Sequence, residues 1–540
     1  RGNGGQGVHV SYDGSLSVSK MARKMDVMNS KEWMAAFKQG LENANQFQGM
    51  NFDTDLSKIF TDERLFKNGE PIYDTDWQDA CSRTALSQNH QLSIQRTGAD
   101  GSSIGAFLNF TDQQGILLNS YYKRVNAKVS YDDNPTKWLS TSVNMLVNHT
   151  WGNRTSDNPY NQGGLRTMIE QVPFLPVSLD GEYMQNNMIR TTAILKDKND
   201  PSRGYQGFQP EGVGNPVEIF KRVESMSYNT QIFGNAALTF HLLKGLDLKT
   251  QVGVDYHNGR SQGYTPFKPH QIIDMSANGS ASASNSSSLY WQEETYLTYN
   301  KVFGDHRLNA MAGLSWTERT QNWNKARTEG FSDDFFEDYN MSAGTTPSSP
   351  ESSWNRWRMN SYFLRFAYTY KDRYSATVTG RVDGSSKFGD NNKYAFFPSA
   401  GLAWNISQED FLKDNNTISN LKLHTSYGLT GSSEIDMYRS LARVSYGTLL
   451  INEVRNPYSY VSSMANPDLK WEKTGQFDVG VEVGLWQNKL TFDIAYYNKK
   501  TTDLLLDCPL PHSTGFSTVY KNIGSVRNSG MDLMINARPV

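Results

Sequence analysis

The stretch Gln476–Tyr496, QFDVGVEVGLWQNKLTFDIAY, decides the fold class. Apolar side chains alternate with polar side chains or glycine over 477–485, and the alternation resumes over 490–496 after a turn at 487–488. In a β-strand, successive side chains point to opposite faces, so a period of two indicates a strand with two different faces. The stretch therefore predicts a β-hairpin with one apolar and one polar face.

The same alternation recurs along the chain, for example over 124–131, 246–256, 361–370 and 374–382. Counting such segments predicts about sixteen strands. Charged residues on the polar face are expected to pair across neighbouring strands; these are Arg365, Arg381, Asp478, Glu482 and Asp493.

The connections between these segments alternate in length. Short links at 132–137, 243–246, 303–306, 371–373 and 487–488 are separated by long links at about 21–86, 151–227, 258–288, 320–356, 430–475 and 500–524. A soluble β-sandwich has no reason for this pattern, because loops of that length are uncommon in compact domains. Outer-membrane barrels have short turns on one side and long loops on the other. We therefore expect an all-β fold, a large antiparallel transmembrane β-barrel with long extracellular loops.

Composition is consistent with this interpretation. The chain has 540 residues, with 53 Lys and Arg against 55 Asp and Glu, so it lacks the basic excess expected of a nucleic-acid-binding protein. Mean hydropathy is −0.62 and no run of eighteen apolar residues occurs, which argues against a helical membrane protein. Aromatic residues make up 12%, which suits aromatic girdles at two membrane interfaces.

Two features are expected inside the long loops. Residues 30–44 have helical spacing at Trp33, Phe37 and Leu41, with Ser30 as the expected N-cap. Residues 276–288 are rich in Ser, Ala and Asn and are expected to form a flexible loop tip.

Motifs for chemistry are mostly absent. No nucleotide-binding loop, zinc-protease motif or serine-hydrolase motif occurs, so the chain is not expected to be an enzyme or to hold a cofactor or metal. Acidic clusters at 53–55 and 333–338 are interpreted as solvated loops in preference to calcium sites. Cys81 and Cys508 are both expected in external loops, where a single disulfide and two separate thiols remain alternatives.

Aromatic residues in the expected loops are the candidate ligand-binding residues, because their ring faces can stack on sugars. The alternative is that they pack loops together or lie at the membrane interface. The candidates are Trp151, Tyr160, Tyr183, Trp291, Trp323 and Trp354.

Several long stretches resemble the SusC-like (SusC/RagA) family of TonB-dependent transporters from Bacteroidetes. The clearest are YFLRFAYTYKDRY at 362–374, GRVDGSSKFG at 380–389, YAFFPSAGLAW at 394–404 and ISNLKLHTSYGLTG at 418–431. Shorter stretches at 75–79, 88–93, 466–474 and 522–530 fit the same family, and all of these matches occur in order along the chain.

The resemblance implies a cell outer-membrane barrel of roughly twenty-two strands, so that about six would lie outside this chain. Residues 1–6 are then interpreted as the linker from a missing plug domain, and 7–540 as an incomplete barrel domain. The implied partners are a SusD-like lipoprotein, the TonB–ExbB–ExbD energy system and outer-membrane lipid, with no nucleic acid. The implied function is active nutrient import, most simply of an oligosaccharide. A peptide importer of the same family and a non-transporting surface adhesin remain alternatives.

Overall fold

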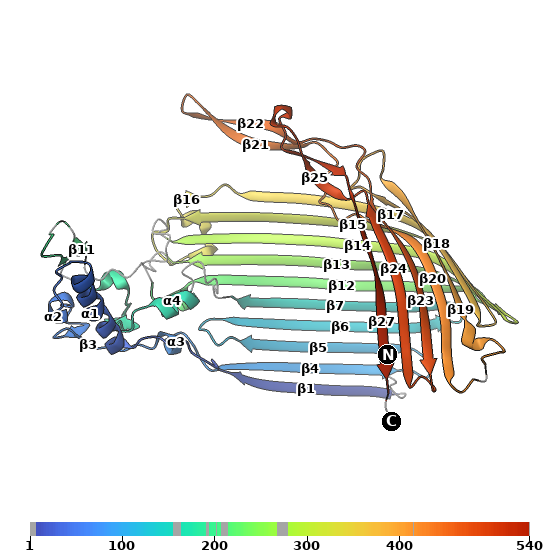
Figure 1. Ribbon diagram of the computed structural model, residues 1–540, viewed down its shortest axis with the longest axis horizontal. Helices are drawn as coiled ribbons and strands as arrows, with labels where there is room; N and C mark the ends of the chain where they lie inside the picture. The colour runs from blue at the N-terminus through green and yellow to red at the C-terminus, as the bar shows by residue number, and fades with distance from the viewer. Residues whose placement is uncertain are drawn as a thin grey trace.

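The computed structural model describes residues 7–154, 164–190, 194–200, 202, 204–206, 214–266, 279–413 and 415–538. One curved antiparallel sheet contains most of these residues (Figure 1). It has 17 strands, of which β16 (Thr346–Pro347) is a two-residue piece beside the end of β15. The other strands are 12 to 24 residues long, which confirms the expected all-β fold and the strand count of about sixteen.

The long strands pair with their neighbours in chain order. Their bounds are β1 (Gly7–Ser19), β4 (Ala85–Thr97), β5 (Ser103–Gln114), β6 (Tyr121–Thr136), β7 (Leu139–Asn153), β12 (Glu224–Leu243), β13 (Leu246–Thr265), β14 (Ser280–Phe303), β15 (His306–Glu329), β17 (Glu351–Tyr370), β18 (Tyr374–Ser385), β19 (Tyr394–Asn405), β20 (Ile418–Ser432), β23 (Glu472–Leu485), β24 (Leu490–Thr502) and β27 (Ser525–Ala537). Among the described residues β1 pairs only with β4, and β27 only with β24. These two strands are therefore the edges of the sheet.

Short turns lie at one end of the sheet, as the alternation of link lengths predicts. The links at that end are residues 98–102, 137–138, 244–245, 304–305, 371–373 and 486–489, together with the longer link 406–417. Lys371 and Asp372 both have φ of 53°, the left-handed conformation that tight hairpin turns require. The long connections all lie at the opposite end.

Two of the expected long loops, 258–288 and 320–356, are shorter than predicted. β15 continues to Glu329, and β17 already begins at Glu351. β13 continues to Thr265, and β14 already begins at Ser280. Residues 280–288 therefore do not form the expected flexible tip, because they pair with β13 on one side and β15 on the other; 276–278 lie outside the described residues. The hydrogen bonds between strands are made by backbone groups, which serine provides as well as any other residue. A serine-rich run can therefore continue a strand even though its side chains do not alternate between apolar and polar.

Two long connections fold together into a separate body beside the open end of the sheet, which we call the loop body (Figure 1). The connection between β1 and β4 provides α1 (Ser30–Phe47), α2 (Leu56–Ile59), β2 (Phe66–Lys67), β3 (Glu70–Pro71) and α3 (Trp77–Ala80). The connection between β7 and β12 provides α4 (Gly164–Glu170), β8 (Ser178–Leu179), β9 (Glu182–Tyr183), η1 (Asn186–Met188), β10 (Ile194–Lys196), β11 (Gly204–Gln206) and α5 (Pro216–Arg222). Phe60 and Phe174, one from each connection, are among the residues of their shared buried core.

Helix α1 confirms the helix expected at 30–44 but begins differently. Its N-cap is Asn29, which accepts a hydrogen bond from the Glu32 amide while the Glu32 carboxylate accepts one from the Asn29 amide. Ser30 is the first helical residue, and its hydroxyl donates to the carbonyl of Tyr73. The predicted cap is therefore wrong by one residue, because Asn29 forms a complete capping box.

The remaining connections carry short elements. They are η2 (Glu337–Tyr339), η3 (Met341–Ala343), η4 (Ile406–Gln408), β21 (Arg443–Ile451), β22 (Val454–Ser463), β25 (Leu505–Pro509), η5 (His512–Thr514) and β26 (Thr518–Asn522). Within the described part of the chain, no helix combines the length and apolar character needed to cross a bilayer.

Candidate functional site

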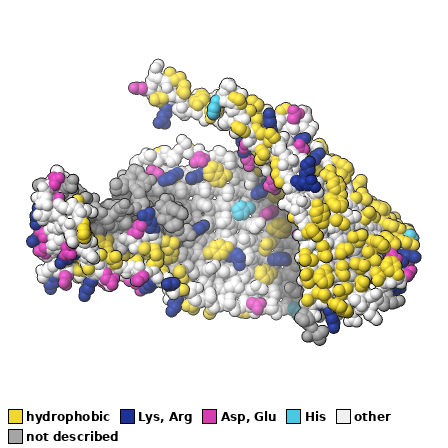
Figure 2. Space-filling view, viewed as in Figure 1, with side chains coloured by type: hydrophobic (Ala, Val, Ile, Leu, Met, Phe, Trp, Pro, Cys, Tyr) yellow, Lys and Arg dark blue, Asp and Glu magenta, His cyan; other side chains and the backbone are white. Residues whose placement is uncertain are grey.

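The curved sheet has an apolar outer face and a polar inner face. Figure 2 shows hydrophobic side chains covering the outer surface of the strands near the C-terminus, while the hollow inner surface behind them is mostly polar. On β17 the outward Tyr362, Leu364 and Phe366 are 49%, 66% and 50% exposed. An exposed apolar band on long antiparallel strands is typical of a wall that faces lipid.

The inner face carries the charges that the alternation predicted there. Glu482 pairs with Lys422 across β23 and β20 at 2.7 Å, which confirms the expected cross-strand pairing for that carboxylate. Arg381 instead pairs at 2.6 Å with Asp383, two residues along its own strand. Because alternate residues of a strand share a face, both pairs lie on the inner side.

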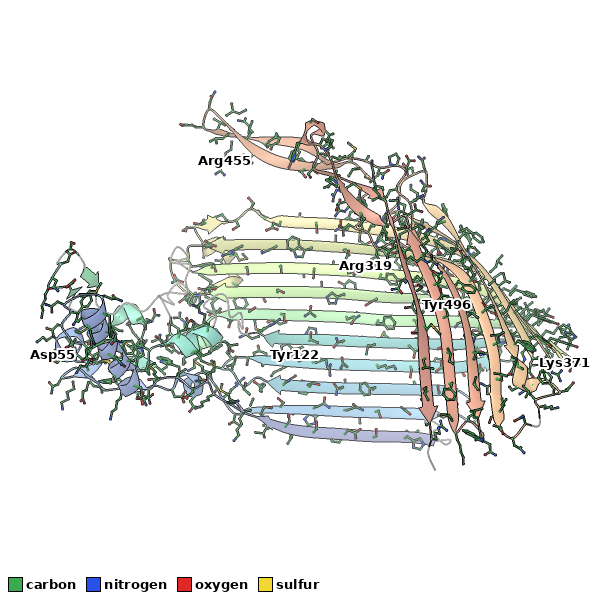
Figure 3. All side chains as sticks on the ribbon, in the orientation of Figure 1. Asp55, Tyr122, Arg319, Lys371, Arg455 and Tyr496 are labelled. Atoms are coloured by element: carbon green, nitrogen blue, oxygen red, sulfur yellow. The ribbon has the colours of Figure 1, made fainter. Side chains whose placement is uncertain are left out.

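One cross-strand row on the inner face brings aromatic and charged residues together. In register, Phe233 lies opposite Asp255, then Tyr290, Arg319 and Trp357 follow on the next three strands. We call these five residues the inner row; Figure 3 labels Arg319 on it. Directly opposed residues of an antiparallel sheet point to the same side, so all five face the hollow of the wall.

Lys387, in the turn after β18, extends the inner row. Its Nζ lies 5.3 Å from the centre of the Trp357 ring and donates to the Ser433 carbonyl at 3.2 Å. Burial lowers the pKa of Lys387 from its ordinary value. The Tyr290 and Trp357 rings are 6.5 Å apart. Two rings and two cations on one patch can stack on a ligand and donate hydrogen bonds to it.

Three of the motifs quoted above meet in one cluster, which we call the motif cluster. Gly389 N donates to the Leu469 carbonyl at 2.9 Å, and the Phe388 and Trp471 rings are 4.7 Å apart. Asn522 Nδ2 donates to the Lys470 carbonyl at 2.7 Å. The motifs at 380–389, 466–474 and 522–530 therefore hold long connections against the sheet and each other, which is a structural role.

The structure places four of the six predicted ligand-binding aromatics on the sheet rather than in loops. Trp151 lies on β7, Trp291 on β14, Trp323 on β15 and Trp354 on β17. The expectation of loop positions is wrong for them because these strands extend further than the apolar alternation does. Tyr183 lies on β9 in the loop body, and Tyr160 lies outside the described residues.

Only one of those four faces the hollow of the wall. Trp323 is in phase with Arg319, whereas Trp151, Trp291 and Trp354 are in phase with the apolar outer residues of their strands. Trp354 is 54% exposed, with the Arg356 guanidinium 5.8 Å from its ring. The structure thus brings none of the four together at one site.

The residues of the inner row were not predicted as candidates. A period of two shows which residues share a face, but it does not show which residues of neighbouring strands are opposed. The Tyr290–Arg319–Trp357 alignment depends on the register of three strands. The sequence did contain one hint of the inner row. Arg319, Tyr290 and Trp357 all fall on the polar faces of consecutive alternating segments.

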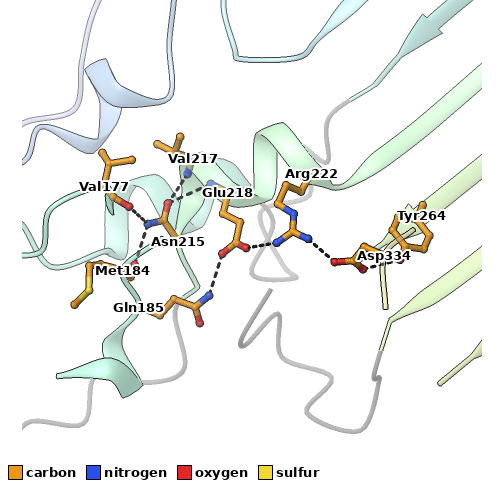
Figure 4. A network of polar contacts seen from close by, with 9 residues as sticks. All are labelled: Val177, Met184, Gln185, Asn215, Val217, Glu218, Arg222, Tyr264 and Asp334. Carbon is orange, nitrogen blue, oxygen red and sulfur yellow. Dashed lines mark hydrogen bonds and ion pairs between the residues drawn. The ribbon is translucent and has the colours of Figure 1, made fainter. Parts of the chain in front are cut away.

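A network of polar contacts fastens the loop body to the sheet (Figure 4). Asn215 caps α5 by accepting from the Val217 and Glu218 amides at 3.1 and 3.2 Å. Glu218 pairs with Arg222 at 2.8 Å, Arg222 also pairs with Asp334, and the hydroxyl of Tyr264 on β13 donates to Asp334. The acidic segment 333–338 therefore has a structural role through Asp334.

That segment also contributes to a group of carboxylates. Oxygens of Glu224, Glu337 and Asp338 lie within 4.8 Å of one another, and Gln262 donates to Asp338. Such an oxygen set suits a hard divalent cation. The other acidic cluster, at 53–55, is explained by Lys58, which pairs with Asp53 and Asp55.

The two cysteines are unpaired. Cys81 is fully buried in the core of the loop body, and burial raises the pKa of its thiol to about 12. Cys508 is half-buried on β25. Of the two alternatives, the structure has separate thiols rather than a disulfide.

Comparisons with known proteins agree with this geometry. Residues 322–538 match the family model described as TonB dependent receptor-like, beta-barrel. TonB-dependent receptor P3 of Formosa agariphila is 31% identical over 86% of this chain and 45% of its own length. TonB-dependent receptor SusC of Bacteroides thetaiotaomicron is 29% identical over 100% of this chain and 51% of its own length. The chain is therefore similar to TonB-dependent receptors along most of its length.

A comparison with solved structures shows a similar fold. A solved structure of the RagAB peptide transporter superposes with a TM-score of 0.75 and 23% identity, covering 99% of this chain and 59% of that one. The resemblance to SusC-like receptors is confirmed, and the curved sheet is the wall of an outer-membrane barrel. The chain spans about half the length of the curated relatives that it matches.

Proposed function

We propose that the chain forms part of the barrel of an active importer that takes up an oligosaccharide across the outer membrane. The observation that carries the proposal is the inner row, which presents rings and charges to the hollow of a wall whose outer face is apolar. A pore through lipid needs that division of faces. Similarity to SusC over the whole chain supports the assignment to import.

The chemistry of the inner row favours a sugar as cargo. Trp357 and Tyr290 offer ring faces on which the apolar face of a sugar can stack. Arg319 can donate to sugar hydroxyls, while Asp255 can accept from them. A small number of weak contacts suits a cargo that must leave as readily as it enters.

A peptide is the second candidate cargo, on a specific observation. Arg319 and Lys387 flank Trp357, and two cations at one ring also suit the carboxylate of a peptide. The structural neighbour RagAB is a peptide transporter, and its likeness to this chain supports the fold.

The proposal includes further parts of the receptor. The unpaired edges at β1 and β27 would not be tolerated in lipid, so we propose that additional strands close the wall between them. A plug domain, joined through residues 1–6, would fill the barrel, and a SusD-like lipoprotein would deliver cargo to the long connections. The TonB–ExbB–ExbD system would supply the energy to move the plug.

Uptake of labelled cargo by cells that carry the full-length receptor tests the proposal. The variant Trp357→Ala removes a ring from the inner row, and Trp316→Ala, which removes an outward ring that is 40% exposed, is its matched control. We expect W357A to lower uptake of one labelled oligosaccharide about tenfold, as loss of a stacking contact allows. The control should leave uptake unchanged.

The same cells separate the alternatives. Loss of oligosaccharide uptake in cells without TonB would support active import. Uptake of labelled peptides, with no uptake of the oligosaccharide, would identify the peptide importer. Surface binding that is indifferent to TonB and never leads to uptake would contradict import and favour an adhesin. Release of cleaved sugar by the purified receptor would contradict transport without catalysis.

A further inference from the structure

The outer face of β17 changes in character along the strand. Alternate residues of a strand share a face, so the outward Leu364 defines the other outward positions. From the short turn upward, the outward residues are Tyr370, Tyr368, Phe366, Leu364, Tyr362, Asn360, Arg358, Arg356 and Trp354. Apolar side chains therefore give way to arginine on one face of a single strand. We call these nine residues the outer column.

The change from apolar to charged falls where the hydrocarbon of a membrane would end. Asn360 is ten residues from Tyr370, which corresponds to about 33 Å along a strand. A strand tilt of about 40° reduces this to a height of about 25 Å, which is the height of the apolar band of an outer-membrane barrel. Arg358 and Arg356 come next on the strand, so they lie at the level of lipid headgroups on the side of the long connections.

The two arginines give this part of the outer face a positive charge. The Arg358 side chain is 57% exposed and pairs through its Nε with Glu318 on β15. The Arg356 guanidinium lies 5.8 Å from the centre of the Trp354 ring, and among the described residues no carboxylate pairs with it. Two guanidinium groups beside one carboxylate leave a net positive charge. Guanidinium groups bind phosphate oxygens through pairs of hydrogen bonds.

An apolar groove lies lower on the same outer face. Its volume is about 850 Å³, and most of its walls are outward side chains of neighbouring strands. One cross-strand row through it consists of Leu297, Ala312, Leu364, Gly380 and Pro398. The small residues at Ala312 and Gly380 leave a trough on each side of Leu364. A trough with apolar walls gives an acyl chain more van der Waals contacts than a flat surface does.

The groove and the arginines are one lipid length apart. Arg358 and Leu364 are separated by six residues, which is about 20 Å along the strand and about 15 Å in height at the same tilt. The hydrocarbon core of a bilayer is about 30 Å thick, so one leaflet accounts for about 15 Å. A single lipid with its headgroup at the arginines can therefore place an acyl chain in the groove.

We propose that the outer column is a binding site for one anionic lipid of the outer leaflet. The headgroup phosphate accepts hydrogen bonds from Arg356 and Arg358, and an acyl chain lies in the trough beside Leu364. Charge complementarity at one end and continuity with the exposed apolar band at the other favour a lipid as the occupant. The inference goes beyond the proposed function, because it concerns the outer face and is independent of the cargo.

Native mass spectrometry of the full-length receptor in detergent tests the proposal. The probes are diphosphoryl lipid A, which has phosphates and acyl chains, digalactosyl diacylglycerol, which has acyl chains without phosphate, and inorganic phosphate. We expect lipid A to bind most tightly, the galactolipid to bind more weakly, and inorganic phosphate at equal concentration to leave lipid A bound. Equal affinity for the two lipids would overturn the proposal, and so would displacement of lipid A by inorganic phosphate.

The headgroup contact is tested by Arg356→Gln. This variant should weaken lipid A binding about fivefold, the effect of one arginine near a charged lipid surface, and leave galactolipid binding unchanged. Arg327→Gln is the matched control, because Arg327 has a 47% exposed side chain on β15 but is in phase with Arg319 on the inner face. Equal weakening by R356Q and R327Q would show a general effect of charge and overturn the site.

The acyl contact is tested by Ala312→Phe, which fills the trough. This variant should weaken binding of both lipids about threefold, as the loss of a few van der Waals contacts allows. Ala236→Phe is its control, because Ala236 is an outward alanine of β12 outside the groove. Unchanged binding of both lipids in A312F, or equal weakening in A236F, would contradict an acyl chain in the groove and overturn the proposal.

Discussion

The loop body and the barrel wall are stabilised in different ways. The loop body has a compact core, in which Phe60, Leu65, Phe174 and Leu175 are 0 to 2% exposed. The wall has its large apolar side chains on the outside, where Leu364 is 66% and Leu402 61% exposed. The loop body thus folds as a soluble domain does, by excluding water, whereas the wall depends on backbone ladders and on lipid.

The same residue type therefore stabilises the two regions of this chain in different ways. A phenylalanine in the loop body contributes by being buried, and one on the wall contributes by facing lipid. Variants of matched chemistry in the two regions should therefore have different effects, which the following experiments on the full-length receptor measure.

The largest effect is expected from a cavity in the loop body. Phe174 is fully buried and its ring contacts those of Trp33, Phe60 and Phe66, so Phe174→Ala should destabilise the loop body by about 3–5 kcal/mol. Hydrogen exchange of the α1 amides should accelerate, while exchange in β17 stays unchanged. Phe366→Ala on the wall is the control. Faster exchange of the α1 amides in that variant would contradict the claim that the loop body and the wall are stabilised in different ways.

A charge on the outer face is the corresponding change in the wall. Leu364→Arg places a guanidinium in the apolar band, and we expect a loss of about 2–4 kcal/mol in the free energy of folding into lipid vesicles. Ala367→Arg, on the inner face of the same strand, should have a much smaller effect. Urea titration in vesicles measures both, and equal losses would argue against two distinct faces.

The motif cluster should be sensitive to a single methyl group. A Cβ at Gly389 would overlap the Pro467 carbonyl oxygen, so Gly389→Ala should cost about 1–3 kcal/mol by overpacking. Gly401→Ala is the matched control, since its nearest neighbours would lie at 3.6 Å, an ordinary contact. Hydrogen exchange around 466–471 should rise only in G389A. Equal exchange in both variants would mean that the motifs do not hold this connection in place.

Acid should loosen the loop body before the wall, through Asp62. Burial of this side chain opposes ionisation, but hydrogen bonds from the Arg64 side chain at 2.7 Å and the Arg190 amide at 3.0 Å outweigh it and lower the pKa of Asp62. A carboxyl group with a lowered folded pKa stabilises the fold above its unfolded pKa of about 3.9 and ceases to do so as pH falls through the folded value. Limited proteolysis should therefore show α1 released below about pH 4, and Asp62→Asn should remove this dependence. A profile that is identical in D62N would assign the acid sensitivity to other groups.

The smallest expected effect is a difference in the rates at which the two thiols are chemically labelled. Cys508 is half-buried in a loop hairpin, so a maleimide should modify it at neutral pH in the folded receptor. Cys81 should react only after the loop body unfolds, because burial both blocks access and raises the pKa of the thiol to about 12. Mass spectrometry of labelled peptides measures the order, and early labelling of Cys81 would contradict a closed core.

The wall could largely be predicted from the sequence because each strand is a local pattern. Phe477, Val479 and Val481 alternate with Asp478 and Gly480 regardless of what lies beside them. The full lengths of β13, β14 and β15 could not be predicted, since residues such as Ser284 and Ser286 extend a strand through backbone pairing alone.

The loop body and the candidate sites depend on contacts that no local pattern shows. Phe60 and Phe174 are 114 positions apart in the sequence and their rings lie 6.0 Å apart in the fold. Tyr183 was a predicted candidate, and it lies on β9 in the loop body, but Trp357 could be found only once the register of the strands was known.

Site-directed spin labelling along β17 tests the central claim most directly. A nitroxide is placed in turn at residues 361 to 370 of the full-length receptor in vesicles, with both native cysteines replaced, and its accessibility to oxygen and to a water-soluble nickel reagent is measured. We expect accessibility to alternate with a period of two, with the positions of Tyr362, Leu364 and Phe366 open to oxygen in lipid and those of Phe363, Arg365 and Ala367 open to nickel. Equal accessibility at odd and even positions, or alternation of the opposite phase, would contradict a lipid-facing outer surface and a wet inner one.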